Sequence, residues 1–263
     1  MKDRDKYDRV RNIIYRGDVV ALTGAGISKE SGIPTFREKG GIWDRYDPSI
    51  YGSILGLSSL FLFKPQRIRN FIVDVYEGII SATPNPAHFA LARLEGEDKI
   101  VCVITQNIDN LHREAGSKRV YELHGNLYVE RCMKCGKRHK HSKEEMSALL
   151  DFLKSARRYE ILSRILPRCG CGGRKRPDVV LFGESLPREE FENAYREIRT
   201  CKTLLLVGTS GIVYPAASLP YAAKERGATL IEISPEPTAL SSLADHTIIG
   251  KAGDILPKLL ERK

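Results

Sequence analysis

Short apolar runs rich in β-branched residues alternate with longer, helix-like segments along most of the chain. Runs of this length bounded by polar or small residues are typical of buried strands. Strands separated by helical segments predict an α/β fold, with a Rossmann-like parallel sheet and crossover helices. We expect strands at Val19–Thr23, Ile100–Thr105, Val120–Leu123, Val179–Phe182, Leu204–Val207, Thr229–Ile233 and Thr247–Ile249.

Small and polar residues directly follow five of these runs. In an open α/β sheet, ligands bind beyond the carboxyl ends of the strands. The five clusters therefore predict one shared crevice. They are Gly24-Ala25-Gly26, Gln106-Asn107-Ile108-Asp109, His124-Gly125, Gly183-Glu184 and Gly208-Thr209-Ser210.

Two stretches interrupt the alternation and predict a smaller module inserted into the sheet domain. We expect residues 1–38, 86–126 and 178–263 to form the sheet domain, 39–85 a cofactor loop and helical insertion, and 127–177 a zinc-binding insertion. The apolar run Ile54–Phe63 predicts a buried helix or a loop that packs on another element, since it is too short to span a bilayer.

Composition and charge exclude some classes of protein. The 263 residues are 42% hydrophobic and 29% charged, which excludes a disordered, collagen-like or coiled-coil chain. Lys and Arg number 42 against 33 Asp and Glu, for a net charge of +9. The charged N-terminus has no apolar stretch behind it, so we expect no secretory signal, no membrane partner and a cytoplasmic protein.

The run Val19–Thr23 leads into Gly24-Ala25-Gly26-Ile27-Ser28, a glycine turn between a strand and a helix. Glycine lets the backbone approach a phosphate, and a helix N-terminus presents free N–H groups, so we expect a dinucleotide here. Lys29 stands where G-x-G-x-x-G has its third glycine, and the acidic residue expected about twenty positions later is missing. A hydride-transferring dehydrogenase is thus not the first expectation, and an ordinary strand–helix turn is the alternative.

Two close cysteine pairs, Cys132/Cys135 and Cys169/Cys171, are separated by 33 residues. Four thiolates in two pairs suit a closed, tetrahedral zinc site, and neighbouring glycines allow the tight turns that such a site needs. Four unrelated cysteines are the alternative. We expect Cys102 and Cys201 to be core residues.

Basic residues gather around these cysteines. They predict either an association with nucleic acid or chromatin or, slightly favoured, a solvated basic face. The residues are Arg131, Lys134, Lys137, Arg138, Lys140, Lys143 and Arg174-Lys175-Arg176.

His124 ends one predicted strand, and Asn107 and Asp109 follow another. A histidine has the pKa range of a general base, and the amide and carboxyl could hold a carboxamide or a water. A structural histidine and two turn-forming residues are the alternative.

Taken together, the motifs resemble the sirtuin family of NAD-dependent protein deacylases. They occur in the family's order and cover nearly the whole chain. They are Gly24-Ala25-Gly26-Ile27-Ser28, Ser31-Gly32-Ile33-Pro34-x-Phe36-Arg37, Thr105-Gln106-Asn107-Ile108-Asp109, Leu123-His124-Gly125, the paired cysteines, residues 179–187, Gly208-Thr209-Ser210 and Lys251-Ala252-Gly253.

The resemblance implies that NAD lies across the strand ends, with Phe36 and Arg37 in a loop that closes over the nicotinamide. Ile108 and Asp109 would hold the carboxamide. The residues that the resemblance assigns to NAD are Gly24, Ala25, Gly26, Ser28, Ile33, Pro34, Phe36, Arg37, Gln106, Asn107, Ile108, Asp109, Gly208, Thr209, Ser210, Ser234 and Ala252.

The resemblance also implies the catalytic and substrate residues. His124 would be the general base for a ribose hydroxyl, and Asn107 would face the ribose and its water. An acetyl-lysine protein would bind as an extended strand through backbone contacts. Its contacts would come from Val180, Phe182, Gly183, Glu184 and Val213.

Two features set this chain apart within the family. Ser234 stands where the family usually has an Asn against the adenosine ribose. The Tyr-x-x-Arg motif of members that prefer negatively charged acyl groups is absent between Gln66 and Ile80, where Tyr76 is followed by Glu77-Gly78-Ile79. We therefore expect uncharged acyl groups, acetyl first.

Three functions remain open at this point. The first is an NAD-dependent lysine deacetylase that transfers acetyl to ADP-ribose and releases nicotinamide. The second is a protein mono-ADP-ribosyltransferase that uses the same NAD site. The third is a non-catalytic zinc- and chromatin-binding protein. Intact His124, Asn107 and Asp109 argue against the third.

Overall fold

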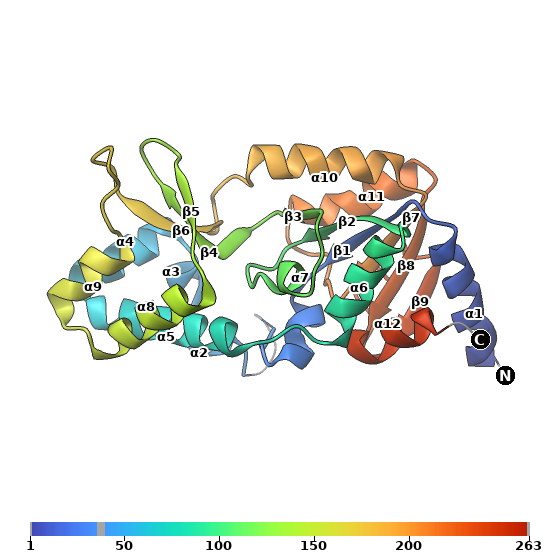
Figure 1. The fold of residues 1–263 in the computed structure, drawn as a ribbon, viewed down its shortest axis with the longest axis horizontal. Coiled ribbons are helices and arrows are strands. Elements are labelled where there is room, and N and C mark those ends of the chain that lie inside the picture. Colours follow the sequence, from blue (N-terminus) through green and yellow to red (C-terminus); the bar gives the residue numbers. More distant parts are fainter. Residues whose placement is uncertain (1, 36–39, 262–263) are drawn as a thin grey trace.

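Two sheets, one parallel and one antiparallel, organise the chain (Figure 1). The computed structural model describes residues 2–35 and 40–261. Six parallel strands in the order β3-β2-β1-β7-β8-β9 form the larger sheet, which confirms the predicted Rossmann-like fold. Its strands are β1 (Val19–Thr23), β2 (Ile100–Thr105), β3 (Val120–Glu122), β7 (Thr203–Val207), β8 (Thr229–Ser234) and β9 (His246–Ile249).

Helices cover both faces of the larger sheet, and alternate residues of each strand face opposite layers. Val19 and Ala21 of β1 pack with α1 (Lys2–Tyr15), α6 (Pro86–Gly96) and α12 (Ala252–Leu260). Val20 and Leu22 pack on the other side with α10 (Arg188–Thr200) and α11 (Leu219–Glu225). The side chains of β1 are therefore buried on both faces of the sheet, and such a strand reads as a continuous apolar run.

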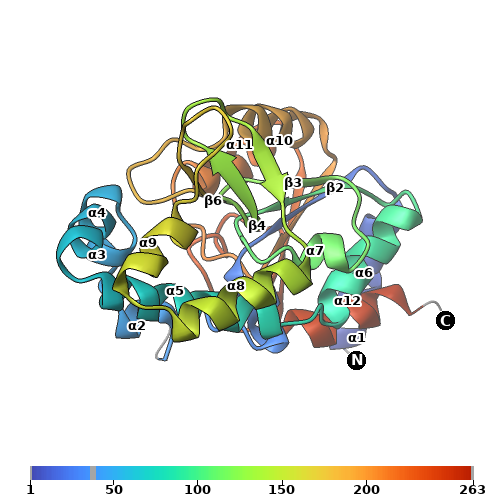
Figure 2. The same ribbon diagram turned by 60° about the vertical axis from the view of Figure 1, so that its left-hand side comes forward.

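The smaller sheet belongs to a module at the opposite end of the molecule from the two termini (Figure 1). Its antiparallel order is β5-β4-β6. Tyr76, Leu127 and Met146 join helices and sheet in a separate small core. Figure 2 shows α5 and α8 side by side at the lower edge of the module. The elements are α2 (Ile42–Arg45), α3 (Pro48–Tyr51), α4 (Ile54–Phe63), α5 (Pro65–Ser81), β4 (Gly125–Cys132), β5 (Arg138–Lys140), α8 (Lys143–Ser155), α9 (Arg158–Ile165) and β6 (Lys175–Val179).

The predicted strand at Val179–Phe182 is wrong in both extent and sheet. Only Val179 lies in a strand, β6, which pairs antiparallel with β4 through Val179 opposite Gly125. A short apolar run predicts extended backbone but carries no information about its partner strand. Gly183-Glu184 therefore does not follow a strand of the parallel sheet, although its neighbour Val180 still lies beside His124, whose carbonyl accepts the Val180 N–H at 2.9 Å.

The run Ile54–Phe63 forms a helix, α4, but most of it is not buried. Leu60 is buried, whereas Leu55 is 86% exposed and Phe63 is 75% exposed. The helix is apolar on all sides, but its neighbours α3 and α5 cover only part of it, so the rest of its apolar surface stays exposed. In the described residues, we find no helix with the length and apolar character that a membrane span requires.

Candidate active site

The predicted crevice lies where β1 and β7 end side by side, at the point where the strand order reverses. The turn after β1 continues into a short 3-10 helix, η1 (Ala25–Ser31). Gly26 donates its N–H to the Gly208 carbonyl at 2.9 Å, and a Cβ on Gly26 would lie 2.7 Å from the Gly208 Cα. Gly208 also has a φ of +58°. Glycine is therefore required at both positions for the two strand ends to meet.

The loop after β2 brings an amide and a carboxyl to the hydroxyl of Ser28 in η1. Ser28 Oγ donates to Asp109 Oδ2 at 2.7 Å, and Asn107 Nδ2 donates to Ser28 Oγ at 3.0 Å. Asp109 Oδ1 accepts the Leu111 N–H at 3.0 Å. Burial raises the pKa of Asp109, an effect that these hydrogen bonds oppose. The loop is thus held in one conformation by contacts from η1.

A second contact joins this loop to the end of β7. Gln106 Nε2 donates to Thr209 Oγ1 at 2.8 Å, so residues far apart in the sequence meet beyond the ends of β2 and β7. Thr209 is buried, whereas Ser210 beside it is exposed. Hydroxyl, amide and carboxyl groups of this kind suit the ribose hydroxyls and carboxamide of a dinucleotide. The N–H of Ala25, at the start of η1, has no acceptor within that helix and is suited to a phosphate.

His124 lies between β3 and β4, where the chain leaves the larger sheet for the smaller one. Its Nδ1 lies 2.9 Å from the carbonyl oxygen of Gln106. Because a carbonyl only accepts, Nδ1 carries the proton and Nε2 keeps a lone pair. Burial lowers the pKa of the imidazole, and this hydrogen bond partly offsets the effect. The ring is therefore neutral at pH 7 and able to accept a proton at Nε2.

Gly125 fixes the position of this histidine relative to the module. Its φ is +80°, and a Cβ there would lie 1.8 Å from the carbonyl oxygen of Asp178 in β6. No side chain fits in that space. The backbones of β4 and β6 can therefore meet directly beside His124.

Sequence reasoning missed a buried network behind the crevice. His88 Nε2 lies 3.4 Å from Ser28 Oγ, and its Nδ1 accepts the Asn85 N–H at 3.3 Å. His112 Nε2 lies 2.9 Å from Thr23 Oγ1. Burial lowers the pKa of His88 to about 4 and that of His112 well below its usual value, so both rings are neutral. The Asn-Pro-x-His start of α6 was the available signal, because it is a capping pattern with a histidine at the third helical position.

Four more of the predicted NAD residues are described by the structure. Ser234 is buried at the end of β8, and its carbonyl accepts the Gly250 N–H at 3.0 Å, close to Ala252 at the start of α12. Ile33 and Pro34 follow η1, and Ile33 packs against the core of the module. Phe36 and Arg37 lie outside the described residues.

The predicted substrate segment is already partly paired within the chain. The Phe182 N–H donates to the Gly52 carbonyl at 2.7 Å, and Phe182 forms a parallel bridge with Ser53. Both carboxylate oxygens of Glu184 lie 2.7 Å from the Arg176 guanidinium. Gly183 has a φ of +88° and forms the turn between them, and Val213 lies in the loop after β7.

The four paired cysteines converge at the tip of the β4–β5 hairpin. Their sulfur atoms lie within 4.8 Å of one another, with 3.5 Å between Cys132 and Cys171 and 3.9 Å between Cys135 and Cys169. Sulfurs around a tetrahedral zinc lie about 3.8 Å apart. The N–H groups of Cys135 and Lys134 point at the Cys132 sulfur and lower its pKa to about 6. These residues fit one structural zinc. As predicted, Cys102 and Cys201 are buried in the core.

Much of the positive charge of the module is paired inside it. Arg131 and Arg138 both contact Asp178, at 2.8 and 2.7 Å. Lys175 contacts Glu130 at 2.8 Å. The solvated basic face is therefore smaller than the sequence alone indicates.

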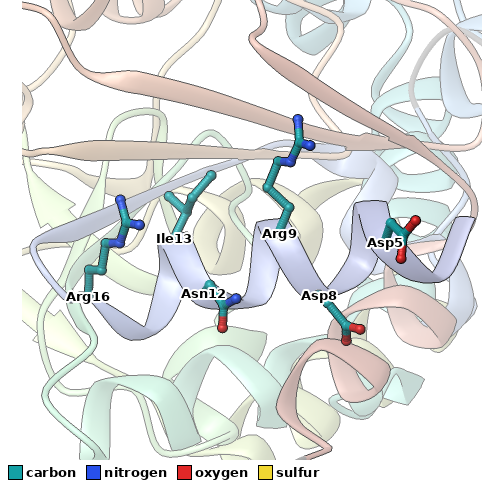
Figure 3. Close-up of a pocket in the computed structure, with 6 residues that line it drawn as sticks. All are labelled: Asp5, Asp8, Arg9, Asn12, Ile13 and Arg16. Atoms are coloured by element: carbon teal, nitrogen blue, oxygen red, sulfur yellow. The ribbon is translucent and has the colours of Figure 1, made fainter. Parts of the chain in front are cut away.

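A surface hollow of about 500 Å³ lies far from all of these residues, along α1 at the other end of the molecule (Figure 3). Its lining comes from that one helix, so it has no opposing wall. Asp8 there is already paired with Arg11. We assign no function to this hollow. Its lining residues are Asp5, Asp8, Arg9, Asn12, Ile13 and Arg16.

Comparison with known proteins agrees with this geometry. Residues 24–215 match the model of the Sir2 family. An NAD-dependent protein deacylase of Pyrococcus furiosus is 47% identical over 244 residues, which cover 92% of this chain and 91% of that protein. A solved Sir2 homologue in complex with NAD has a TM-score of 0.80 and 38% identity, covering 96% of this chain and 91% of the other. Sir2Af2 bound to a myristoylated histone peptide has a TM-score of 0.73 and 35% identity, covering 97% and 95%.

Proposed function

The chain belongs to the Sir2 family, and on this basis we propose that it is an NAD-dependent protein lysine deacylase that acts first on acetyl groups. Membership of the family confirms the resemblance seen in the sequence and makes NAD the cofactor. The acetyl group would pass from lysine to ADP-ribose with release of nicotinamide. The observation that carries the proposal is the neutral His124, with its Nδ1 bound to Gln106 and its Nε2 free to accept a proton.

NAD would supply the ribose that receives the acyl group. Nicotinamide would leave the ribose carbon, the lysine amine would leave the acyl carbon, and one water would be consumed overall. In our proposal, His124 Nε2 accepts the proton of a ribose hydroxyl and so makes that oxygen a better nucleophile toward the acyl carbon. Asn107 and Gln106 orient the ribose, and Asp109 holds the carboxamide. The Ser28 hydroxyl, bonded to both Asp109 and Asn107, fixes the relative positions of these two side chains.

We propose that the acyl-lysine protein binds as an extended strand between residues 180–184 and 211–213. This placement is supported by the contact between the Val180 N–H and the His124 carbonyl, which brings the segment against the catalytic residue. Backbone contacts discriminate little between sequences, so substrate choice should be broad. The pairing of Phe182 with Gly52 means that a peptide would have to share or displace that contact.

The preference for an uncharged acyl group rests on the side chains near Phe182. The Trp43 ring lies 5.9 Å from the Phe182 ring and 6.3 Å from the Phe71 ring, measured between centroids. The nearby Arg45 is paired with Asp74 at 2.9 Å. These surroundings favour apolar acyl groups, with long chains such as myristoyl as the main rival to acetyl.

Mass spectrometry of an acetyl-lysine peptide, with and without NAD, tests the proposal. We expect loss of acetyl only with NAD, matched by free nicotinamide. Nicotinamide without deacetylation would replace the proposal by ADP-ribosyl transfer or NAD hydrolysis, and no reaction would favour a non-catalytic protein. Parallel succinyl and myristoyl peptides of the same sequence test the acyl preference, because faster removal of either would contradict it.

Association with nucleic acid or chromatin, which the basic residues suggest as the alternative to a solvated face, is a separate proposal for the zinc-binding module. Lys134, Lys137 and Lys140 are exposed on it. Binding through such residues should weaken steeply with salt, since it depends on release of counterions from phosphates. A gel-shift titration of duplex DNA at several salt concentrations checks this. Absent or salt-insensitive binding would contradict it.

A further inference from the structure

The geometry points to a second metal site in the module, formed by His139, His141 and Glu145, for a divalent transition-metal ion such as Zn²⁺. The site lies at the opposite end of β5 from the four cysteines and shares no ligand with them. It does not depend on the proposed catalytic function.

Three ligand atoms converge there from two elements. His139 lies in β5 and His141 follows two residues later, so both side chains are on one side of the extended backbone. Glu145 comes from the first turn of α8, only four residues beyond His141. The ligand atoms of all three lie within 4.8 Å of one another, and the two imidazole centroids are 4.7 Å apart. Small rotations of exposed side chains would bring them around one ion.

The surroundings of His141 resemble those of a metal-binding histidine. Its Nδ1 lies 3.6 Å from Glu145 Oε2, on the side where the ion would bind. Its Nε2 is buried without a hydrogen bond, yet Glu130 Oε2 lies 3.3 Å from it. Histidine ligands usually donate their second ring N–H to such a carboxylate. Binding of an ion at Nδ1 would therefore also give the buried Nε2 its partner.

The module is basic, but two lysine side chains near the three ligands are held by other partners. The ammonium of Lys175 is held by Glu130 at 2.8 Å. That of Lys143 donates to the Ala82 carbonyl at 3.1 Å. The remaining donor set, two imidazoles and one carboxylate, suits Zn²⁺ and leaves a coordination position for water. The ion would tie β5 to α8, whose Met146 packs in the core of the module.

The zinc content of purified protein, dialysed against buffered Zn²⁺, tests the proposal. We expect two zinc ions per chain in the wild type and one in Glu145→Gln and His139→Ala. Glu145→Gln is the more specific variant. In the wild type the Ser142 N–H donates to Glu145 Oε2 at 2.8 Å as part of the N-cap of α8, and the amide oxygen of Gln can still accept this bond. Its control is Glu144→Gln, which removes the same charge from the next residue and should keep two.

Titration with Co²⁺ of protein that retains only the zinc of the four cysteines adds a second readout. Nitrogen and oxygen ligands should give weak visible absorption without the intense sulfur-to-cobalt bands of a thiolate site. We expect the apparent affinity to fall at least about tenfold in Glu145→Gln, since loss of even an outer-sphere partner has that effect. One zinc in the wild type, two in both variants, or cobalt bands of sulfur type only would each overturn the proposal.

Discussion

The strand-end crevice and the inserted module are held together in different ways. Around the crevice, Ser28, Asp109 and two buried neutral histidines take part in hydrogen bonds next to a large apolar core. In the module the apolar core is small, and ion pairs and four thiols lie near its surface. The contacts around the crevice are thus made by folding itself, whereas the module has more ion pairs and a set of thiols that fit a zinc ion.

This difference suits the separate tasks that we propose for the two regions. A general base and a cofactor site need fixed geometry, which a dense, buried network provides. The apolar core of the smaller module is small, so a zinc ion at the four cysteines would add to its stability. His124 stands where the two regions join, so its surroundings depend on both.

Removal of the zinc should produce the largest difference in hydrogen exchange between the module and the larger sheet. Structural zinc contributes about 10–16 kcal/mol of apparent binding free energy in small domains, so Cys169→Ser should lose the metal and open residues 127–177. Hydrogen exchange followed by mass spectrometry should show fast exchange in β4–β6 and little change in β1, β2 and β7. Cys201→Ser, a change of a core thiol, is the control and should keep its zinc. An equal rise in hydrogen exchange in both regions of Cys169→Ser would contradict the idea that zinc stabilises the module separately from the larger sheet.

Replacement of His124 should strongly lower the deacetylation rate without affecting either core. We expect His124→Ala to lower the deacetylation rate by about 10² to 10⁴-fold, since that is the usual contribution of a general base. The melting temperature should change little, because the ring makes one hydrogen bond. His246→Ala in β9 is the matched control. A rate within about threefold of wild type would contradict the assigned role.

Matched cavities in the two cores would sharpen the comparison. Ile104 in β2 and Met146 in α8 are both buried, and each change to Ala should cost about 2–5 kcal/mol. Ile104→Ala should lower the temperature of the main unfolding transition. Met146→Ala should mainly raise the rate of amide hydrogen exchange in α5 and α8. Calorimetry and local hydrogen exchange measure the two effects. Identical exchange patterns would show that the chain unfolds as one unit.

The buried histidines should make folding of the sheet domain sensitive to acid. The pKa of His88 is lowered from 6.5 to about 4, so between these values the unfolded chain binds a proton that the folded chain does not. Stability should therefore fall as the pH drops below 6.5, by up to about 3 kcal/mol from this residue near pH 4. His88→Gln keeps a capping residue and should flatten the dependence of melting temperature on pH. An unchanged slope would contradict the assignment.

Much of the larger sheet was predictable because its strands are continuous apolar runs. Val19–Thr23 and Ile100–Thr105 agree with the structure in both bounds, and the other parallel strands differ only at their ends. The strand predicted at Val179–Phe182 was wrong because partner choice depends on β4, which the local sequence does not reveal. The exposure of α4 was missed for the same reason, since burial depends on which elements cover a helix.

For the site, the sequence by itself determined the types of residue and their order: the glycine turn, the Gln106–Asp109 loop, His124 and the four cysteines. These follow from local chemistry, because turns, caps and ligand pairs are encoded by neighbouring residues. Only the tertiary structure decided which atoms meet. Pairing of β1 with β7 brings Gly26 next to Gly208, and burial lowers the pKa of His88 and raises that of Asp109. Distance and desolvation arise from contacts between distant segments, which no local pattern contains.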